Sequence, residues 1–265
     1  ALYIAKTDET EQFFGEMYGK TTGTVRGKGG SMHLAAPGSG LLGVSAVVAS
    51  TIAPAIGAAF ANKMKKNGKI VASFFGDGAV EEGVTWESLN SACLMKLPVI
   101  FVCEDNGLAV DVTAAERRGF KGITAVASAY RCNVFKSKST DTEEIYNLTL
   151  KAMALMKKNQ MPVFMHLIYN RHLQHIGVKD DFDTTGPAPK GGFEKIGYRS
   201  RQEYDRWIKR EPIVVQRKKL IELGVVEKEI VRIETNIHTQ VERSVVNAQA
   251  AHFPGAEELY DHVVA

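Results

Sequence analysis

Two apolar segments separated by one helix-length segment constrain the fold of this chain more than any other feature. The run KIVASFF, residues 69–75, has the length of a strand and ends at Gly76. A helical pattern follows over 83–96, and Pro98 opens a second apolar run, PVIFVCED. Continuous apolar runs are typical of strands covered on both faces. Because strand and helix patterns alternate, we predict an α/β fold with a doubly wound, mostly parallel sheet flanked by helices.

Other segments complete the predicted elements. PVFMHLIYN, residues 162–170, predicts a third strand, and the small apolar residues of 47–66 predict a tightly packed helix. A further helix is expected from a capping-box pattern, Thr140 and Glu143. Two sets of residues are expected on buried helix faces: Val84, Leu89, Cys93 and Leu94 in the first helix, and Ile145, Leu148, Ala152 and Leu155 in the second.

The remaining segments are glycine-rich or polar. Residues 1–45 predict an irregular but ordered loop region, and 176–210 a long loop. Two helices are expected within 212–251, as part of a C-terminal helical extension over 212–265. We predict one domain over 1–265. The opening ALYIAKTDE starts in mid-element, so we expect a further segment before it, with any targeting signal.

Composition excludes several function classes. A formal net charge of +3 in 265 residues provides no case for nucleic acid or an anionic membrane. No apolar run reaches the length of a membrane span. Three cysteines without a CxxC spacing indicate a reducing compartment and no structural zinc. We therefore expect a cytoplasmic protein, or a protein of the mitochondrial matrix in a eukaryote.

Asp77 and Asn106 form the most informative pair of polar residues. Each closes a predicted strand, and their separation, 106 − 77 = 29 residues, is one strand–helix–strand unit. Parallel strands end at the same edge of the sheet, where α/β folds bind ligands. Either residue alone is more often a helix cap or a turn former. Together, a carboxylate and an amide oxygen beside Gly76 and Gly78 indicate a magnesium and phosphate site.

Three motifs carry a resemblance to a known family. GKGGSMHL (27–34), GDGAVEEGVTWESLNSACLMKLPVIFVCEDN (76–106) and YNRHLQH (169–175) stand in this order. The chain resembles the α subunit of the thiamine diphosphate-dependent, decarboxylating component of 2-oxo acid dehydrogenase complexes. The similarity weakens after about residue 180. It implies the thiamine diphosphate-binding fold and oxidative decarboxylation of a pyruvate-like 2-oxo acid, with acyl transfer to a lipoyl group.

The resemblance also implies roles for individual residues. Magnesium ligands would be Asp77, Asn106 and the backbone carbonyl of Leu108. Diphosphate contacts are implied for Gly76, Gly78, Ala79 and Arg171. Within SAVVAS (45–50), Ala46 and Val48 would lie beside the aminopyrimidine ring, although Ala46 replaces the family's usual glycine. His175 would act in catalysis and contact the cofactor, on the active-site side where the 176–210 loop begins. For His33, a pocket role and a structural role are equally open, and His166 is expected to be a hydrogen-bonded core residue.

The resemblance implies partners as well. A β subunit would supply the pyrimidine-side glutamate in an α2β2 assembly, and a lipoyl acyltransferase would accept the acyl group. Two alternatives stay open. The same scaffold serves enzymes that cleave acetoin or transfer its acetaldehyde unit, which activity on 2-oxo acids would separate. A non-catalytic scaffold subunit is the other alternative, and an assembled complex that binds no cofactor would support it.

Overall fold

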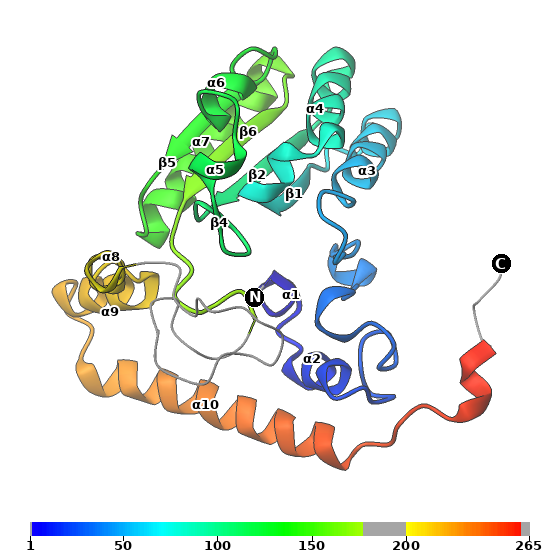
Figure 1. Ribbon diagram of the computed structural model, residues 1–265. Coiled ribbons are helices and arrows are strands. Elements are labelled where there is room, and N and C mark those ends of the chain that lie inside the picture. Colours follow the sequence, from blue (N-terminus) through cyan, green and yellow to red (C-terminus); the bar gives the residue numbers. More distant parts are fainter. Residues whose placement is uncertain (1, 177–199, 261–265) are drawn as a thin grey trace. The chain divides into compact units, whose positions relative to one another are not determined.

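The structure, a computed structural model, describes residues 2–176 and 200–260 (Figure 1). The chain divides into two compact units. We call residues 48–223 the sheet unit, and residues 1–47 with 224–265 the helical unit. The sequence predicted one domain with a C-terminal extension over 212–265. In the structure that extension is divided, because residues up to 223 belong to the sheet unit and later ones to the helical unit.

The sheet unit is built on a four-stranded sheet. Its order is β1-β2-β6-β5, and every neighbouring pair is parallel. The strands are β1 Val71–Gly76, β2 Val99–Asp105, β5 Asn133–Ser137 and β6 Val163–Ile168. The predicted α/β class and three of these strands are confirmed. The sequence missed β5 because NVFKS holds only two apolar residues, too few for a strand pattern.

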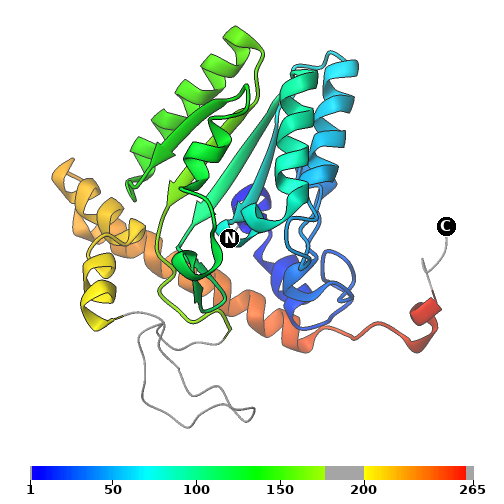
Figure 2. The same cartoon turned by 45° about the horizontal axis from the view of Figure 1, so that its top comes forward.

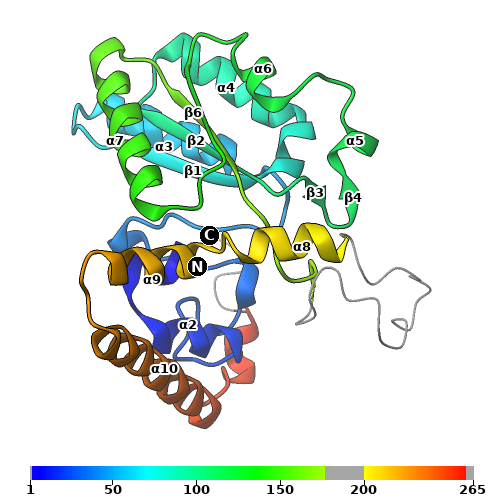
Figure 3. The same cartoon turned by 90° about the vertical axis from the view of Figure 1, so that its left-hand side faces the viewer.

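Helices cover both faces of the sheet (Figures 1 and 3). The helices on one face are α3 Ile52–Met64, α4 Gly83–Met95 and α6 Ile123–Ala127. In Figure 2, α3 and α4 run side by side. On the other face lies α7, Thr142–Asn159. Strand β2 has buried side chains on both faces. Phe101 and Cys103 pack on the side of α3, α4 and α6, and Ile100 and Val102 pack against α7. These layers confirm the predicted sheet flanked by helices.

Strand β1 departs from the prediction that both its faces are covered. Ser73 and Phe75 are buried, whereas Phe74 is 42% exposed. β1 is an edge strand, paired with β2 alone, and its helices cover one face only. A continuous apolar run therefore does not require burial on both sides.

Two predicted helix faces need correction. Leu89 and Cys93 are buried and Val84 is half-buried, but Leu94 is 79% exposed, because it lies one residue round the helix from Cys93. In α7, Ala152 is buried with Met156 rather than Leu155.

The predicted capping box of α7 is also wrong. The N-cap is Asp141, whose carboxylate accepts from the backbone N–H groups of Glu143 and Glu144 at 2.8 and 3.2 Å. A carboxylate at this position satisfies orphan donors of the first turn and complements the helix dipole.

The sheet unit contains further elements outside these layers. They are η3 Asp77–Glu81, the antiparallel pair β3 Leu108–Ala109 and β4 Val112–Thr113, α5 Ala114–Arg117, α8 Arg201–Ile208 and α9 Pro212–Glu222. Helix α8 lies within the predicted 176–210 loop, so that prediction is wrong for 201–208. The signal was present, because Ser200 caps α8 by accepting from the Glu203 N–H. Residues 177–199 lie outside the described residues.

The helical unit contains α1 Leu2–Thr7, α2 Thr10–Met17, η1 Gly30–Met32, η2 Pro37–Ser39, α10 Glu227–Ala250 and η4 Ala256–Tyr260. The expected irregular region 1–45 therefore begins with two helices, which the glycine count concealed. Helix α2 packs on α10, where the hydroxyls of Thr10 and Ser244 lie 2.9 Å apart. The two helices expected in 212–251 are confirmed as α9 and α10.

A buried carboxylate shapes the glycine-rich loop that follows α2. Glu16 is 1% exposed. Its Oε2 accepts from the N–H groups of Val25 and Gly27, and its Oε1 from those of Gly29 and Gly30, at 2.7–3.1 Å. Gly27, at φ +75°, has room for no Cβ, which would lie 2.3 Å from the carbonyl carbon of Gly19. The loop is thus ordered, as predicted, by hydrogen bonds from its backbone to the Glu16 carboxylate.

Among the described residues, none of the helices has the length and apolar character that crossing a membrane requires.

Glu16→Gln tests the contribution of this carboxylate. The amide replaces one acceptor oxygen by a donor and leaves buried N–H groups unpaired, so we expect the free energy of unfolding to fall by about 2 kcal/mol. Urea denaturation followed by circular dichroism measures it. Glu229→Gln, which removes an exposed carboxylate paired with Arg232, is the control and should change nothing measurable. Equal stability of the two variants would contradict the assigned role of Glu16.

Candidate functional site

Asp77 and Asn106 follow adjacent strand ends. Strands β1 and β2 pair in parallel with Gly76 opposite Glu104. Asp77 comes directly after Gly76, and Asn106 directly after Asp105, the last residue of β2. The predicted juxtaposition of the two strand ends is confirmed. Parallel pairing produces it, because both strands run toward the same edge.

Helix α4 holds the Gly76–Glu81 segment in place. The Thr85 hydroxyl donates to the Ala79 carbonyl at 2.5 Å, and Trp86 Nε1 donates to the Val80 carbonyl at 2.8 Å. Thr85 and Val80 are fully buried. At Gly76 a Cβ would meet no heavy atom within 4 Å, so open space adjoins the backbone there. Helix α4 begins at Gly83, after η3, with the partial positive charge of a helix N-terminus.

Asp77 carries the strongest electrostatic contacts of this edge. Its side chain is 1% exposed, and its Oδ2 accepts from guanidinium groups of both Arg117 and Arg118. Burial raises the pKa of Asp77, while the hydrogen bond and charge of Arg117 and the charge of Arg118 oppose that rise. A carboxylate in this setting attracts cations. The sequence missed both arginines, because ERR at 116–118 has the pattern of an ordinary solvated charge run.

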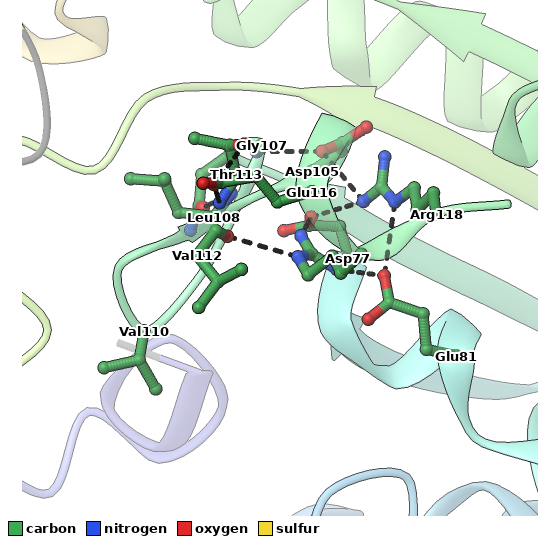
Figure 4. A network of polar contacts seen from close by, with 12 residues as sticks. Asp77, Glu81, Asp105, Gly107, Leu108, Val110, Val112, Thr113, Glu116 and Arg118 are labelled. Carbon is green, nitrogen blue, oxygen red and sulfur yellow. Dashed lines mark hydrogen bonds and ion pairs between the residues drawn. The ribbon is translucent and has the colours of Figure 1, made fainter.

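Two further carboxylates complete this cluster (Figure 4). Glu81 Oε1 accepts from Arg117 and lies 3.3 Å from Arg118 Nε. Asp105 Oδ1 lies 3.7 Å from Arg118 Nη2. We call Asp77, Glu81, Asp105, Arg117 and Arg118 the edge cluster.

Asp105 connects the edge cluster to the core. Its Oδ2 lies 2.7 Å from His166 Nε2, and His166 Nδ1 lies 2.8 Å from the Thr124 hydroxyl. Burial alone would raise the pKa of Asp105, but His166, the Gly107 N–H and the charge of Arg118 together hold it below its ordinary value. His166 is 4% exposed and bonded through both ring nitrogens, which confirms the predicted hydrogen-bonded core role.

Asn106 begins the loop that leads to β3. Its Oδ1 accepts from the Leu108 N–H at 2.9 Å, and its Nδ2 lies 3.4 Å from the Tyr169 hydroxyl. Leu108 is buried and pairs with Thr113 in the β3–β4 hairpin. Metal ligation by Asn106 and Leu108 stays a prediction.

Arg171 and His175 lie together beyond the end of β6. Arg171 Nη1 lies 3.3 Å from His175 Nδ1. Its Nε donates to the Leu173 carbonyl at 2.9 Å, and its Nη2 donates to the Val110 carbonyl at 2.8 Å. Val110 joins β3 to β4, so Arg171 ties this segment to the hairpin that follows Asn106. An arginine only donates, so His175 Nδ1 is the acceptor in this contact, which leaves Nε2 as the donor of the ring.

Of three further predicted site residues, two precede the sheet unit and one is its first residue. His33 and Ala46 are exposed residues of the helical unit, and Val48, 57% exposed, is the first residue of the sheet unit. Their roles beside the cofactor stay predictions. Within the described ranges, no group of three or more His, Cys, Asp or Glu side chains has the arrangement of a metal site. The predicted magnesium site, with one carboxylate, one amide and one carbonyl, does not need such a group.

A comparison with protein-family models assigns the chain to a family. The model described as "Dehydrogenase E1 component" matches residues 1–257. The chain belongs to the dehydrogenase E1 component family. The family resemblance inferred from the motifs is thereby confirmed.

Curated relatives agree with this assignment. "Pyruvate dehydrogenase E1 component subunit alpha" of Rickettsia bellii is 28% identical over 264 residues, which are 99% of this chain and 76% of the relative. The protein of the same name from Zymomonas mobilis is 28% identical over 250 residues, covering 94% of this chain and 66% of the relative.

Solved structures resemble part of the chain. Transketolase from Campylobacter jejuni is 21% identical at a TM-score of 0.43, over 47% of this chain and 20% of that chain. A structure from Mycobacterium smegmatis, titled a putative thiamin diphosphate-dependent enzyme, is 19% identical at a TM-score of 0.37, over 45% and 22%. The matched part thus spans about a fifth of each solved chain.

Thr85→Val tests how the Gly76–Glu81 segment is held. Valine keeps the shape but removes the donor to the buried Ala79 carbonyl, so we expect a loss of about 1–2 kcal/mol in unfolding free energy. Thr85→Ser keeps the hydroxyl and should restore most of that loss in the same urea denaturation. If Thr85→Val is as stable as the original protein, the hydrogen bond does not hold the segment.

Proposed function

We propose that the chain is the α subunit of a thiamine diphosphate-dependent E1 component that oxidatively decarboxylates a 2-oxo acid, pyruvate being the first candidate. The acyl group passes to a lipoyl group of an acyltransferase partner. One observation carries the proposal: a buried carboxylate, Asp77, lies at the carboxyl edge of a parallel sheet beside Asn106, in a chain that matches the E1 family over residues 1–257. The names of the curated relatives support the same activity.

The residues at this edge fit a magnesium ion and a diphosphate. Asp77 is buried and already holds two cationic side chains, and Asn106 and Leu108 add an amide oxygen and a carbonyl, the hard ligands that magnesium prefers. Open space adjoins Gly76, which allows a phosphate to approach the backbone there. Gly78 and Ala79 follow in η3, ahead of α4. Arg171, with its planar fork of donors, suits a diphosphate oxygen pair.

The chemistry that thiamine diphosphate supplies when bound is an electron sink for decarboxylation. The residues of this chain position the metal, the cofactor and the substrate. Asp77, Asn106 and the Leu108 carbonyl orient the metal, and Ala46 and Val48 offer backbone to the pyrimidine side. His175 donates a hydrogen bond from Nε2 to an oxygen of the substrate. Arg171 fixes the ring from the Nδ1 side, and a β subunit completes the site with its glutamate in an α2β2 assembly.

Asp77→Asn tests the metal site. Removal of the negative charge should weaken binding of thiamine diphosphate with Mg²⁺ on the order of 100-fold, the upper end of what changes around metal ligands cost, and abolish turnover. Calorimetry on the chain assembled with its β subunit measures binding. Turnover of pyruvate and other 2-oxo acids with an artificial electron acceptor measures activity. Glu229→Gln neutralises an exposed carboxylate and should match the original protein.

Two results would contradict the proposal. Unchanged cofactor affinity in Asp77→Asn would remove Asp77 from the metal site. Inactivity of the original protein on every 2-oxo acid, together with cleavage of acetoin, would assign the site to another reaction of thiamine diphosphate.

His175→Ala tests hydrogen-bond donation. Loss of a positioned donor to a reacting oxygen lowers kcat by about 100-fold, while the affinity for thiamine diphosphate stays unchanged in calorimetry. His238→Ala, on an exposed position of α10, should keep full activity. A variant of His175 with lower cofactor affinity and unchanged kcat would instead make His175 a binding residue.

A further inference from the structure

Two arginines form ion pairs with Asp77, the carboxylate that the proposed function assigns to magnesium. Arg117 ends α5, and Arg118 is the C-cap of that helix. Both guanidinium groups donate to the same oxygen, Oδ2 of Asp77. The arginine side chains are 10% and 11% exposed, and that of Asp77 is 1% exposed. Solvent therefore screens these contacts far less than it screens surface ion pairs.

The formal charges show why the arginines and a metal ion compete. Asp77, Glu81 and Asp105 carry three negative charges, and Arg117 and Arg118 carry two positive charges, so the edge cluster has a formal charge of −1. A divalent cation added to this arrangement would bring it to +1 and would face two guanidinium groups on the same carboxylate. Like charges at such distances repel strongly where water is excluded.

Both arginines have other partners within reach. Arg117 also pairs with Glu81, through Nη1. Arg118 Nε lies 3.3 Å from Glu81 Oε1, and its Nη2 lies 3.7 Å from Asp105 Oδ1. If Asp77 is released, neither guanidinium is left buried and unpaired, which is the costly outcome for a charge pair. The edge cluster therefore has the partners to exchange one contact for another.

The arginines sit on a short element rather than on the sheet itself. α5 has four residues and is fixed at its start by Thr113, whose N–H and hydroxyl both donate to Glu116. Arg117 Nε donates to the Val112 carbonyl at 3.2 Å, which links α5 to the β3–β4 hairpin. A shift of these side chains can thus occur without breaking the pairing of β1 with β2.

We propose, on the basis of the proposed function, that Arg117 and Arg118 are surrogate cations that hold Asp77 when no metal is bound and that the metal ion must displace. The contact lowers the affinity for a divalent cation by itself and keeps the buried carboxylate paired in the cofactor-free protein. On displacement, Arg117 and Arg118 retain Glu81, and Arg118 closes on Asp105.

Binding of Mn²⁺, measured on the full chain by electron paramagnetic resonance of the free ion, tests this exchange without recourse to activity. Arg117→Gln and Arg118→Gln should each bind Mn²⁺ about tenfold more tightly than the original protein, which corresponds to about 1.4 kcal/mol. Arg117→Lys and Arg118→Lys keep the charge and should stay near the original affinity. Arg232→Gln, from an exposed pair with Glu229, is the matched control and should not differ.

The outcomes separate the two proposals. Glutamine variants that bind Mn²⁺ no more tightly than the original protein would overturn the role of the arginines as competing cations, whatever Asp77 does. Adding Asp77→Asn to either glutamine variant should abolish the gain. If the gain persists in the double variant, the ion binds elsewhere, and both the exchange and the metal site of the proposed function are wrong. Thermal melts of each variant confirm that it is folded.

Discussion

The parallel pairing of β1 with β2 is the constraint on which the candidate site depends. With Gly76 opposite Glu104, the next residues of both strands emerge at one edge of the sheet. A shift of this register would separate Asp77 from Asn106 and would turn buried side chains of β2 to the other layer. Both faces of β2 are buried, by α4 and α6 on one side and by α7 on the other. The core therefore fixes the register, and the register fixes the spacing of the polar residues at the edge.

The buried carboxylates at this edge have partners within the protein. A carboxylate as buried as Asp77 is stable only with a cationic partner, and in this structure Arg117 and Arg118 supply it. Asp105 likewise has partners within the protein: His166, the Gly107 N–H and Arg118. The helical unit repeats the principle with Glu16, whose partners are backbone N–H groups instead of cations. In each case a buried carboxylate is bonded to groups of a neighbouring loop or short helix.

The misses of the sequence-based predictions have identifiable physical causes. Strand β5 and helices α1, α2 and α8 lack the long apolar periodicity that a sequence pattern needs, and their neighbours stabilise them. Leu94 and Leu155 were placed on buried faces because an apolar side chain was taken as a buried one, although many apolar side chains stay at the surface. Arg117 and Arg118 escaped notice because charge runs are usually solvated, and only burial distinguishes these two.

The sequence by itself determined the α/β class, three of the four strands, and the pair Asp77 and Asn106 as the candidate metal site. These follow from local patterns: apolar runs, glycines beside a carboxylate, and the length of one strand–helix–strand unit. The family came from the resemblance of three motifs to known sequences. Only the tertiary structure decided which cations neutralise Asp77, that β1 lies at the edge of the sheet, and that Arg171 holds His175. Such contacts join residues as far apart as 77 and 118 or 110 and 171. Local sequence patterns do not record them, because the packing of distant segments brings these side chains together.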